Sequence, residues 1–258
     1  MRRLLLNGVA VEYEERGTGV PVVFSHGGAS DLRYWAPQRD AFASRYRFVA
    51  YSRRTGDVSA ATQVADLLAI IRRLEAGPVH LVGFSTAIAL RVAAQEPELL
   101  RSLTIVEPNA PWVLEGDRAG KKALADWRRE NKRIHAEAGD DREQAAALWF
   151  DLVNNRGRGA FARQPEQFRS MWLDNFGRDR PTTPPEPLTC QQLKAIRTPT
   201  LALAAEYGMP YSRRIVELVA GCVPECRLAD VPGVTHFMSY QAPRVFNRLV
   251  LDFLAEHA

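Results

Sequence analysis

Three polar residues that could together carry out nucleophilic catalysis follow apolar runs in this sequence. They are Ser85 in GFSTA, Glu107 in LTIVEP and His236 in PGVTHF. A serine hydroxyl is a weak nucleophile until a base takes its proton. A histidine can do so near neutral pH when a carboxylate orients its ring. The three residue types therefore predict acyl-transfer chemistry, provided that the fold brings them together.

The residues around Ser85 have the pattern of a strand, a sharp turn and a helix. The apolar run VHLVGF leads into GFSTA, and AIALRVAAQE follows it at helical spacing. Such a turn exposes a serine at the amino end of a helix, where the backbone N–H of Thr86 can point at an oxyanion. A second N–H donor is expected from the HGG segment at residues 26–28, which follows the run VVFS.

Each of the three residues also has an ordinary structural interpretation. Ser85 would suit a helix N-cap, His236 a hydrogen-bonded loop position, and Glu107 the role of a buried partner for an arginine. The turn, the HGG loop and the downstream histidine in combination favour the catalytic interpretation.

The elements around these residues alternate between strands and helices. Apolar or alternating runs predict strands at 9–17, 20–26, 47–52, 79–84, 103–108, 199–206 and 226–233, and helical spacing predicts helices at 62–77, from 86, at 211–221 and from 243. This alternation predicts an α/β fold with a doubly wound, mostly parallel sheet and helices on both faces. Ligands of such sheets bind beyond the carboxyl ends of the strands, where the three polar residues are expected.

Residues 110–187 interrupt the alternation with several helical segments and no clear strand, and they end in the proline-rich PTTPPEP at 181–187. We therefore expect an α/β core formed by residues 1–109 and 188–258. The inserted residues 110–187 are expected to form a helical lid over the strand ends.

The sequence resembles the serine-hydrolase branch of the α/β-hydrolase fold family over nearly its whole length. The matching segments are HGG, GFSTA, LTIVEP, PTLALAAE, PGVTHF and the terminal PRVFNRLVLDFL, in the family's order of serine, acid and histidine. The resemblance implies that Ser85 is the nucleophile and His236 the general base. It also implies an oxyanion hole formed by the N–H groups of Gly28 and Thr86, with no cofactor and no metal.

Two positions depart from the common family pattern. Gly208 occupies the position after the seventh strand where many members carry the acid, whereas a subset takes the acid from the end of the sixth strand. We expect Glu107 to be that acid, with Glu206 as the alternative acid. Ala87 replaces the usual glycine of the turn, which adds one methyl group and predicts a modest packing adjustment.

Aromatic residues near the predicted strand ends are candidates for the substrate pocket. We expect substrate contacts from Trp35, Trp112, Phe84 and Phe237, which suit a bulky apolar substrate. The other tryptophans of the helical segments are expected mainly in the core of the lid. Arg53 or Arg54 could reach a substrate carboxylate or phosphate, although solvation or loop pairing is the commoner fate.

Composition and charge argue against several other classes of protein. The net charge is +4, but its basic residues do not form the concentrated stripe that nucleic-acid binding needs. No apolar stretch approaches the length of a membrane span, and no export signal is evident, so a soluble cytoplasmic protein is expected. The three cysteines, Cys190, Cys222 and Cys226, are an odd number without a ligand partner set, which predicts free thiols in a reducing compartment.

These observations predict a serine hydrolase that cleaves an ester, lactone or thioester bond of a small-molecule substrate through a Ser-His-Glu triad. Two alternatives remain open. One is a cofactor-free, non-hydrolytic enzyme that cleaves a carbon–carbon bond or cyclises a natural-product intermediate. The other is a non-catalytic ligand-binding protein on the same fold. The sequence predicts no oligomeric state.

Overall fold

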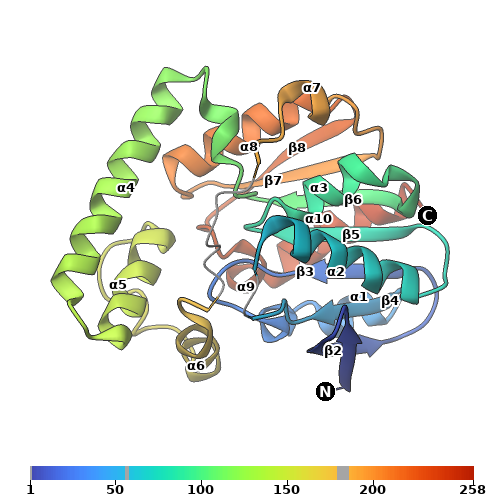
Figure 1. The fold of residues 1–258 in the computed structure, drawn as a ribbon, viewed down its shortest axis with the longest axis horizontal. Helices are drawn as coiled ribbons and strands as arrows, with labels where there is room; N and C mark the ends of the chain where they lie inside the picture. The colour runs from blue at the N-terminus through green and yellow to red at the C-terminus, as the bar shows by residue number, and fades with distance from the viewer. Residues whose placement is uncertain (1, 56–57, 179–185) are drawn as a thin grey trace.

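The computed structural model describes residues 2–55, 58–178 and 186–258, which contain one eight-stranded sheet (Figure 1). The strands lie in the order β1-β2-β4-β3-β5-β6-β7-β8. From β4 to β8 neighbouring strands are parallel, whereas β1 pairs with β2 and β2 with β4 in antiparallel fashion. The expected mostly parallel α/β sheet is confirmed, and its strands are β1 (Arg2–Leu6), β2 (Val9–Arg16), β3 (Pro21–Ser25), β4 (Arg47–Tyr51), β5 (Val79–Phe84), β6 (Leu100–Val106), β7 (Thr200–Ala205) and β8 (Cys226–Val231).

The burial of the strands follows from their position in the sheet. All residues of β3, β5 and β7 are buried, as expected for interior strands that helices cover on both faces. β1 and β2 alternate between buried and exposed residues because the antiparallel edge has one face in solvent. The sequence pattern predicted β2, but it did not predict β1.

Helices cover both faces of the sheet. One core cluster holds side chains of α1 (Arg39–Ala43) and α10 (Pro243–Ala255). The other holds those of α2 (Ala60–Arg73), α3 (Ile88–Gln95) and α8 (Pro210–Cys222). The remaining short helices of the core are η1 (Leu32–Trp35), η2 (Pro97–Leu99), α7 (Cys190–Leu193) and α9 (Met238–Gln241).

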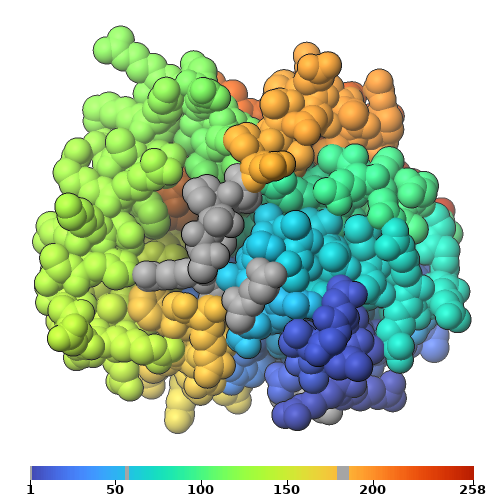
Figure 2. All heavy atoms as spheres, in the orientation of Figure 1, coloured from blue at the N-terminus to red at the C-terminus, as the bar shows by residue number. Residues whose placement is uncertain are grey.

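The described part of the segment between β6 and β7 is mainly helical. It contains η3 (Pro111–Leu114), α4 (Arg118–Ala138), α5 (Arg142–Asn154) and α6 (Glu166–Asn175), which we call the helical block. The helical block lies to one side of the sheet (Figure 1) and forms one flank of the molecule (Figure 2). Most of the proline-rich segment 181–187 lies outside the described residues.

The cysteines correct one expectation. Cys190 in α7 and Cys222 at the end of α8 form a disulfide, with their Cα atoms 5.3 Å apart. They are 32 residues apart in sequence, and the packing of α7 against α8 brings them together. Cys226 keeps its thiol, whose pKa burial raises to about 12. The prediction of three free thiols is therefore wrong, and it no longer supports a reducing compartment.

No helix in the described parts of the chain is both long enough and apolar enough to cross a membrane.

Candidate active site

Ser85 lies in the turn between β5 and α3 with a strained backbone. Its φ is 49°, in the left-handed region that non-glycine residues rarely adopt, and its N–H donates to the carbonyl of Val106 at 2.9 Å. The loop after β3 lies against it, because a Cβ atom added to Gly27 would come within 2.8 Å of the Ser85 Cβ. Ala87 is buried with an ordinary φ of −91°, so the turn accepts its methyl group.

Glu107 follows β6 directly and also has a left-handed backbone, with a φ of 40°. The residue is 1% exposed, and Oε1 accepts a hydrogen bond from the N–H of Ala205 at 3.1 Å. The absence of a side chain at Gly208 provides the space, because a Cβ atom there would lie 2.4 Å from Glu107 Oε1. The glycine at the common acid position thus makes room for the carboxylate of the neighbouring strand.

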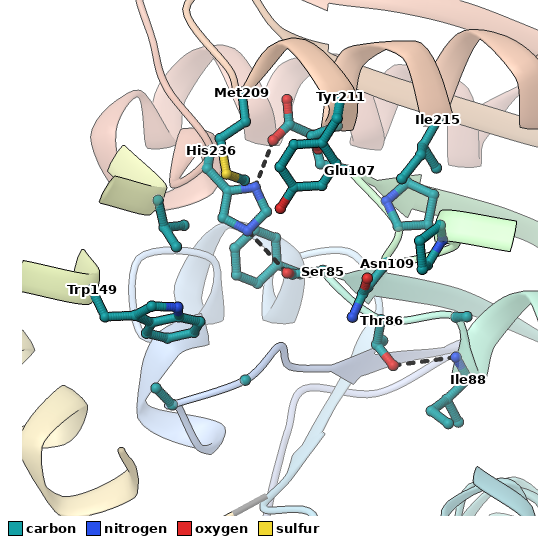
Figure 3. Close-up of a pocket in the computed structure, with 18 of the residues that line it drawn as sticks. Ser85, Thr86, Ile88, Glu107, Asn109, Trp149, Met209, Tyr211, Ile215 and His236 are labelled. Carbon is teal, nitrogen blue, oxygen red and sulfur yellow. Dashed lines mark hydrogen bonds and ion pairs between the residues drawn. The ribbon is translucent and has the colours of Figure 1, made fainter. Parts of the chain in front are cut away.

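His236 lies after β8 and connects the other two residues (Figure 3). Its Nδ1 is 2.5 Å from Glu107 Oε2, and its Nε2 is 2.9 Å from Ser85 Oγ. Because a carboxylate only accepts hydrogen bonds, Nδ1 carries the proton and donates it, which leaves Nε2 to accept from the serine hydroxyl. This is the order of contacts in which an imidazole can take the serine proton.

The alternative acid, Glu206, lies elsewhere. Its side chain is exposed, and its Oε2 accepts a hydrogen bond from the N–H of Gly233 at 2.7 Å. This bond, ahead of a weaker contribution from Tyr207, lowers the pKa of the Glu206 carboxyl. The structure brings Glu107, and not Glu206, to His236.

The loop after β3 is held by a buried histidine. His26 Nε2 accepts from the N–H of Arg53 at 2.9 Å, so its Nδ1 carries the proton and donates to the Gly27 carbonyl at 2.8 Å. Burial, and secondly the charge of Arg53, lower the pKa of His26 to about 3, and the ring is therefore neutral. A trans peptide directs its N–H opposite its carbonyl, so the Gly28 N–H points away from this cluster, and Gly28 lines the cavity beside Ser85.

Thr86, the other residue expected in the oxyanion hole, also lines the cavity. Its Oγ1 accepts a hydrogen bond from the N–H of Ile88, the first residue of α3, at 3.2 Å (Figure 3).

A cavity of about 460 Å³ opens next to Ser85, between the strand ends and the helical block. The predicted pocket residues Phe84 and Phe237 line it. The centres of the Phe84 and His236 rings are 4.8 Å apart. Trp35 and Trp112 are not among the described residues that line it, which corrects the prediction for both. Trp35 is fully buried against Phe24, and Trp112 packs under the guanidinium of Arg91.

Several lining residues were not singled out from the sequence. Tyr211 at the start of α8 directs its hydroxyl into the cavity beside His236, and Trp149 lies across from it (Figure 3). Burial, followed by the negative charge of Glu107, raises the pKa of Tyr211, so its hydroxyl stays protonated and available as a donor. Only the tertiary structure places these side chains, along with Asn109, Met209, Trp127, Trp172 and Phe176, at the cavity.

Within the described ranges, no group of three or more His, Cys, Asp or Glu side chains is arranged to hold a metal ion.

Comparison with known proteins identifies the family. The sequence pattern of the alpha/beta hydrolase family matches residues 22–249, so the chain belongs to this family and is an enzyme of the α/β-hydrolase type. It is 26% identical to the "Putative carbamate hydrolase RutD" of Azorhizobium caulinodans, over 95% of this chain and 94% of that protein.

Solved structures share the fold. A bromoperoxidase from Bacillus anthracis superposes with a TM-score of 0.78 at 22% identity, over 98% of this chain and 99% of that one. Est816, described as an N-acyl homoserine lactone degrading enzyme, gives a TM-score of 0.74 at 19% identity, over 98% of this chain and 100% of its own.

Proposed function

We propose that this α/β hydrolase is a serine hydrolase that cleaves an ester, lactone or thioester bond of a small substrate with an apolar body. The observation that supports it most is the hydrogen-bonded series Ser85–His236–Glu107 at the wall of the cavity. The aromatic residues Phe84, Trp149 and Phe237 at the same cavity suit an apolar substrate.

In this mechanism Ser85 Oγ attacks the carbonyl carbon while its proton moves to His236 Nε2. Glu107 keeps the His236 ring oriented and stabilises the positive charge that forms on it. The N–H groups of Gly28 and Thr86 stabilise the negative oxygen of the tetrahedral intermediate. His236 then returns the proton to the leaving group, and a water molecule, activated by the same nitrogen, releases the acyl group from Ser85.

The helical block serves in this proposal as a lid over the strand ends. Its residues Leu124, Trp127, Trp149 and Trp172 line the cavity and would exclude water from the acyl-enzyme. A cytoplasmic location stays a prediction.

The test is labelling with a fluorophosphonate probe combined with hydrolysis of p-nitrophenyl butyrate. Ser85→Ala should abolish labelling and reduce kcat by about 10³-fold or more, because removal of a nucleophile leaves only the oxyanion hole and substrate binding. Ser170→Ala, at an exposed serine of α6, is the matched control and should label as the wild type does. Absence of labelling in the folded wild type would favour a non-hydrolytic enzyme or a binding protein.

A further inference from the structure

Arg91 is a buried arginine in α3 that lines the cavity six residues after Ser85. The residue is 9% exposed, and one amino group of its side chain donates to the backbone carbonyl of Glu186. Its guanidinium carbon lies 5.3 Å from the centre of the Trp112 ring. Its Nε is buried and has no hydrogen-bond partner among the described residues.

A second arginine with the same burial shows what Arg91 lacks. Arg54 is also 9% exposed, but it donates to both carboxylate oxygens of Asp66, at 2.5 and 2.7 Å. No described carboxylate forms an ion pair with Arg91. Burial lowers the pKa of the Arg91 guanidinium, and the charge of Glu186 opposes this only in part. A buried guanidinium without an anion is destabilising, and a bound anion would offset that effect.

The other charged residues that line the cavity also favour an anionic ligand. Arg53 and Arg128 line it as well, whereas Glu107 is the one carboxylate among its described lining residues. Both oxygens of Glu107 are engaged, by His236 and by the N–H of Ala205. Neither oxygen of the one described lining carboxylate is therefore directed to Arg91.

The first residue of α3, the helix that carries Arg91, and the aromatic Trp149 lie on different sides of Ser85 (Figure 3). Ile88 and Arg91 are three residues apart on α3 and so share a face of that helix. Ile88 lies on the opposite side of Ser85 from Trp149 (Figure 3). Arg91 lies three residues into α3, a rise of about 4.5 Å from Ile88, whereas Ser85 lies three residues before the helix, in the turn. A ligand that reaches both residues needs several bonds between its two polar ends.

We propose that Arg91 binds a carboxylate of the substrate, so that the substrate class is a carboxylate-bearing ester or lactone whose anionic group lies several bonds from the carbonyl that Ser85 attacks. This inference rests on the proposed hydrolase function for its kinetic consequences, but binding of the anion does not depend on turnover. A guanidinium recognises a carboxylate with parallel N–H donors, and Nε is one of the donors that such a pair uses.

The kinetic test compares p-nitrophenyl hydrogen glutarate and p-nitrophenyl hydrogen adipate with their methyl esters. The wild type should prefer the free carboxylates. Arg91→Gln should lower the ratio of kcat/KM between carboxylate and methyl ester by about 10- to 100-fold, mainly through KM, as expected for a charged hydrogen bond. Arg91→Lys should retain part of the preference. Arg72→Gln, at an exposed arginine that pairs with Glu96, should leave the ratio unchanged.

A binding test separates this inference from the proposed function. Benzyl hydrogen glutarate and its methyl ester are titrated calorimetrically into Ser85→Ala protein, with and without Arg91→Gln, after thermal melting shows that each variant is folded. If Arg91→Gln does not fold, Arg91→Lys takes its place and should weaken binding of the carboxylate ligand.

Loss of carboxylate binding in the arginine variant, without turnover of any ester by the wild type, would retain the anion site and reject the hydrolase. Turnover with a carboxylate preference that does not depend on Arg91, or equal binding of the two ligands, would overturn the anion site.

Discussion

The carboxyl ends of β6 and β7 are neighbours in the sheet, and each is followed by a glutamate, yet the two glutamates have opposite environments. Glu107, one residue after β6, is buried and bonded to His236. Glu206, one residue after β7, is exposed and bonded to the N–H of Gly233. The positive φ at residue 107 turns the first carboxylate inward, and Gly208 leaves the volume that it occupies. The difference teaches that the available space and the local backbone decide which carboxylate meets the histidine.

Removing the charge of each glutamate in turn should give the largest difference in activity between the two strand ends. Glu107→Gln should lower kcat for p-nitrophenyl butyrate by roughly 10³- to 10⁴-fold, since an amide no longer holds the required His236 tautomer or stabilises its charged form. Glu206→Gln should change kcat by no more than about twofold, as is usual for exposed positions. Full activity in the first variant together with loss in the second would reverse the comparison.

Filling the space beside Glu107 should lower kcat by less than removing its charge does. Gly208→Ala adds a Cβ atom where Glu107 Oε1 lies, so the carboxylate must move. We expect kcat to fall on the order of 10- to 100-fold from misplacement of His236. Urea unfolding should show a loss of stability of about 1–3 kcal/mol from overpacking.

Gly221→Ala is the control for this substitution, because a Cβ atom there meets nothing within 4 Å. It should leave kcat unchanged. If Gly208→Ala were as active as the wild type, the absence of a side chain at Gly208 would not be required for the position of Glu107.

The acid dependence of stability should distinguish buried from exposed polar groups at the strand ends. The folded-state pKa of His26, after β3, is about 3, below its ordinary value of 6.5, so the unfolded chain binds the extra proton between these values. Stability contributed by the neutral ring is present above pH 6.5 and falls with acidification by up to about 1.4 kcal/mol per pH unit. The buried His80, whose pKa is lowered to about 4, acts in the same direction.

Urea unfolding at pH 5 and pH 7 measures this dependence. His26→Gln should flatten it. Glu206→Gln removes an exposed carboxylate of lowered pKa, so it should lower stability only slightly and by nearly the same amount at pH 5 and pH 7, because both values lie above its ordinary pKa of 4.5. An equally steep dependence in His26→Gln would show that the ring is not held neutral.

Much of the fold was predictable because the signals are local. Buried parallel strands such as β5 and β7 are continuous apolar runs, and α2 and α10 have helical spacing. β1 was not predicted because RRLLL has charged residues and no clear alternation. Its pairing with β2 stabilises it as an edge strand. The positions of Ser85, Glu107 and His236 at loop ends were also visible in the sequence, although their catalytic roles await the experiments above.

Other features depend on contacts between distant segments. The pairing of Cys190 with Cys222 follows from helix packing across 32 residues of sequence, and the nearer Cys226 lies on the following strand. Trp35 and Trp112 follow strand ends, as pocket residues often do, but their side chains turn into packed surroundings. Aromatic type and position along the chain do not fix the direction of a side chain.

The sequence by itself determined the alternation of strands and helices and the sharp turn that presents Ser85, because each depends on residues within a few positions of one another. Only the tertiary structure decided that Glu107 meets His236, that Gly208 leaves room for it, and that Arg91 lies buried at the cavity with no ion pair to an acidic side chain that the structure describes. These features are set by volume and charge contributed from separate strands and helices, which a linear pattern does not contain.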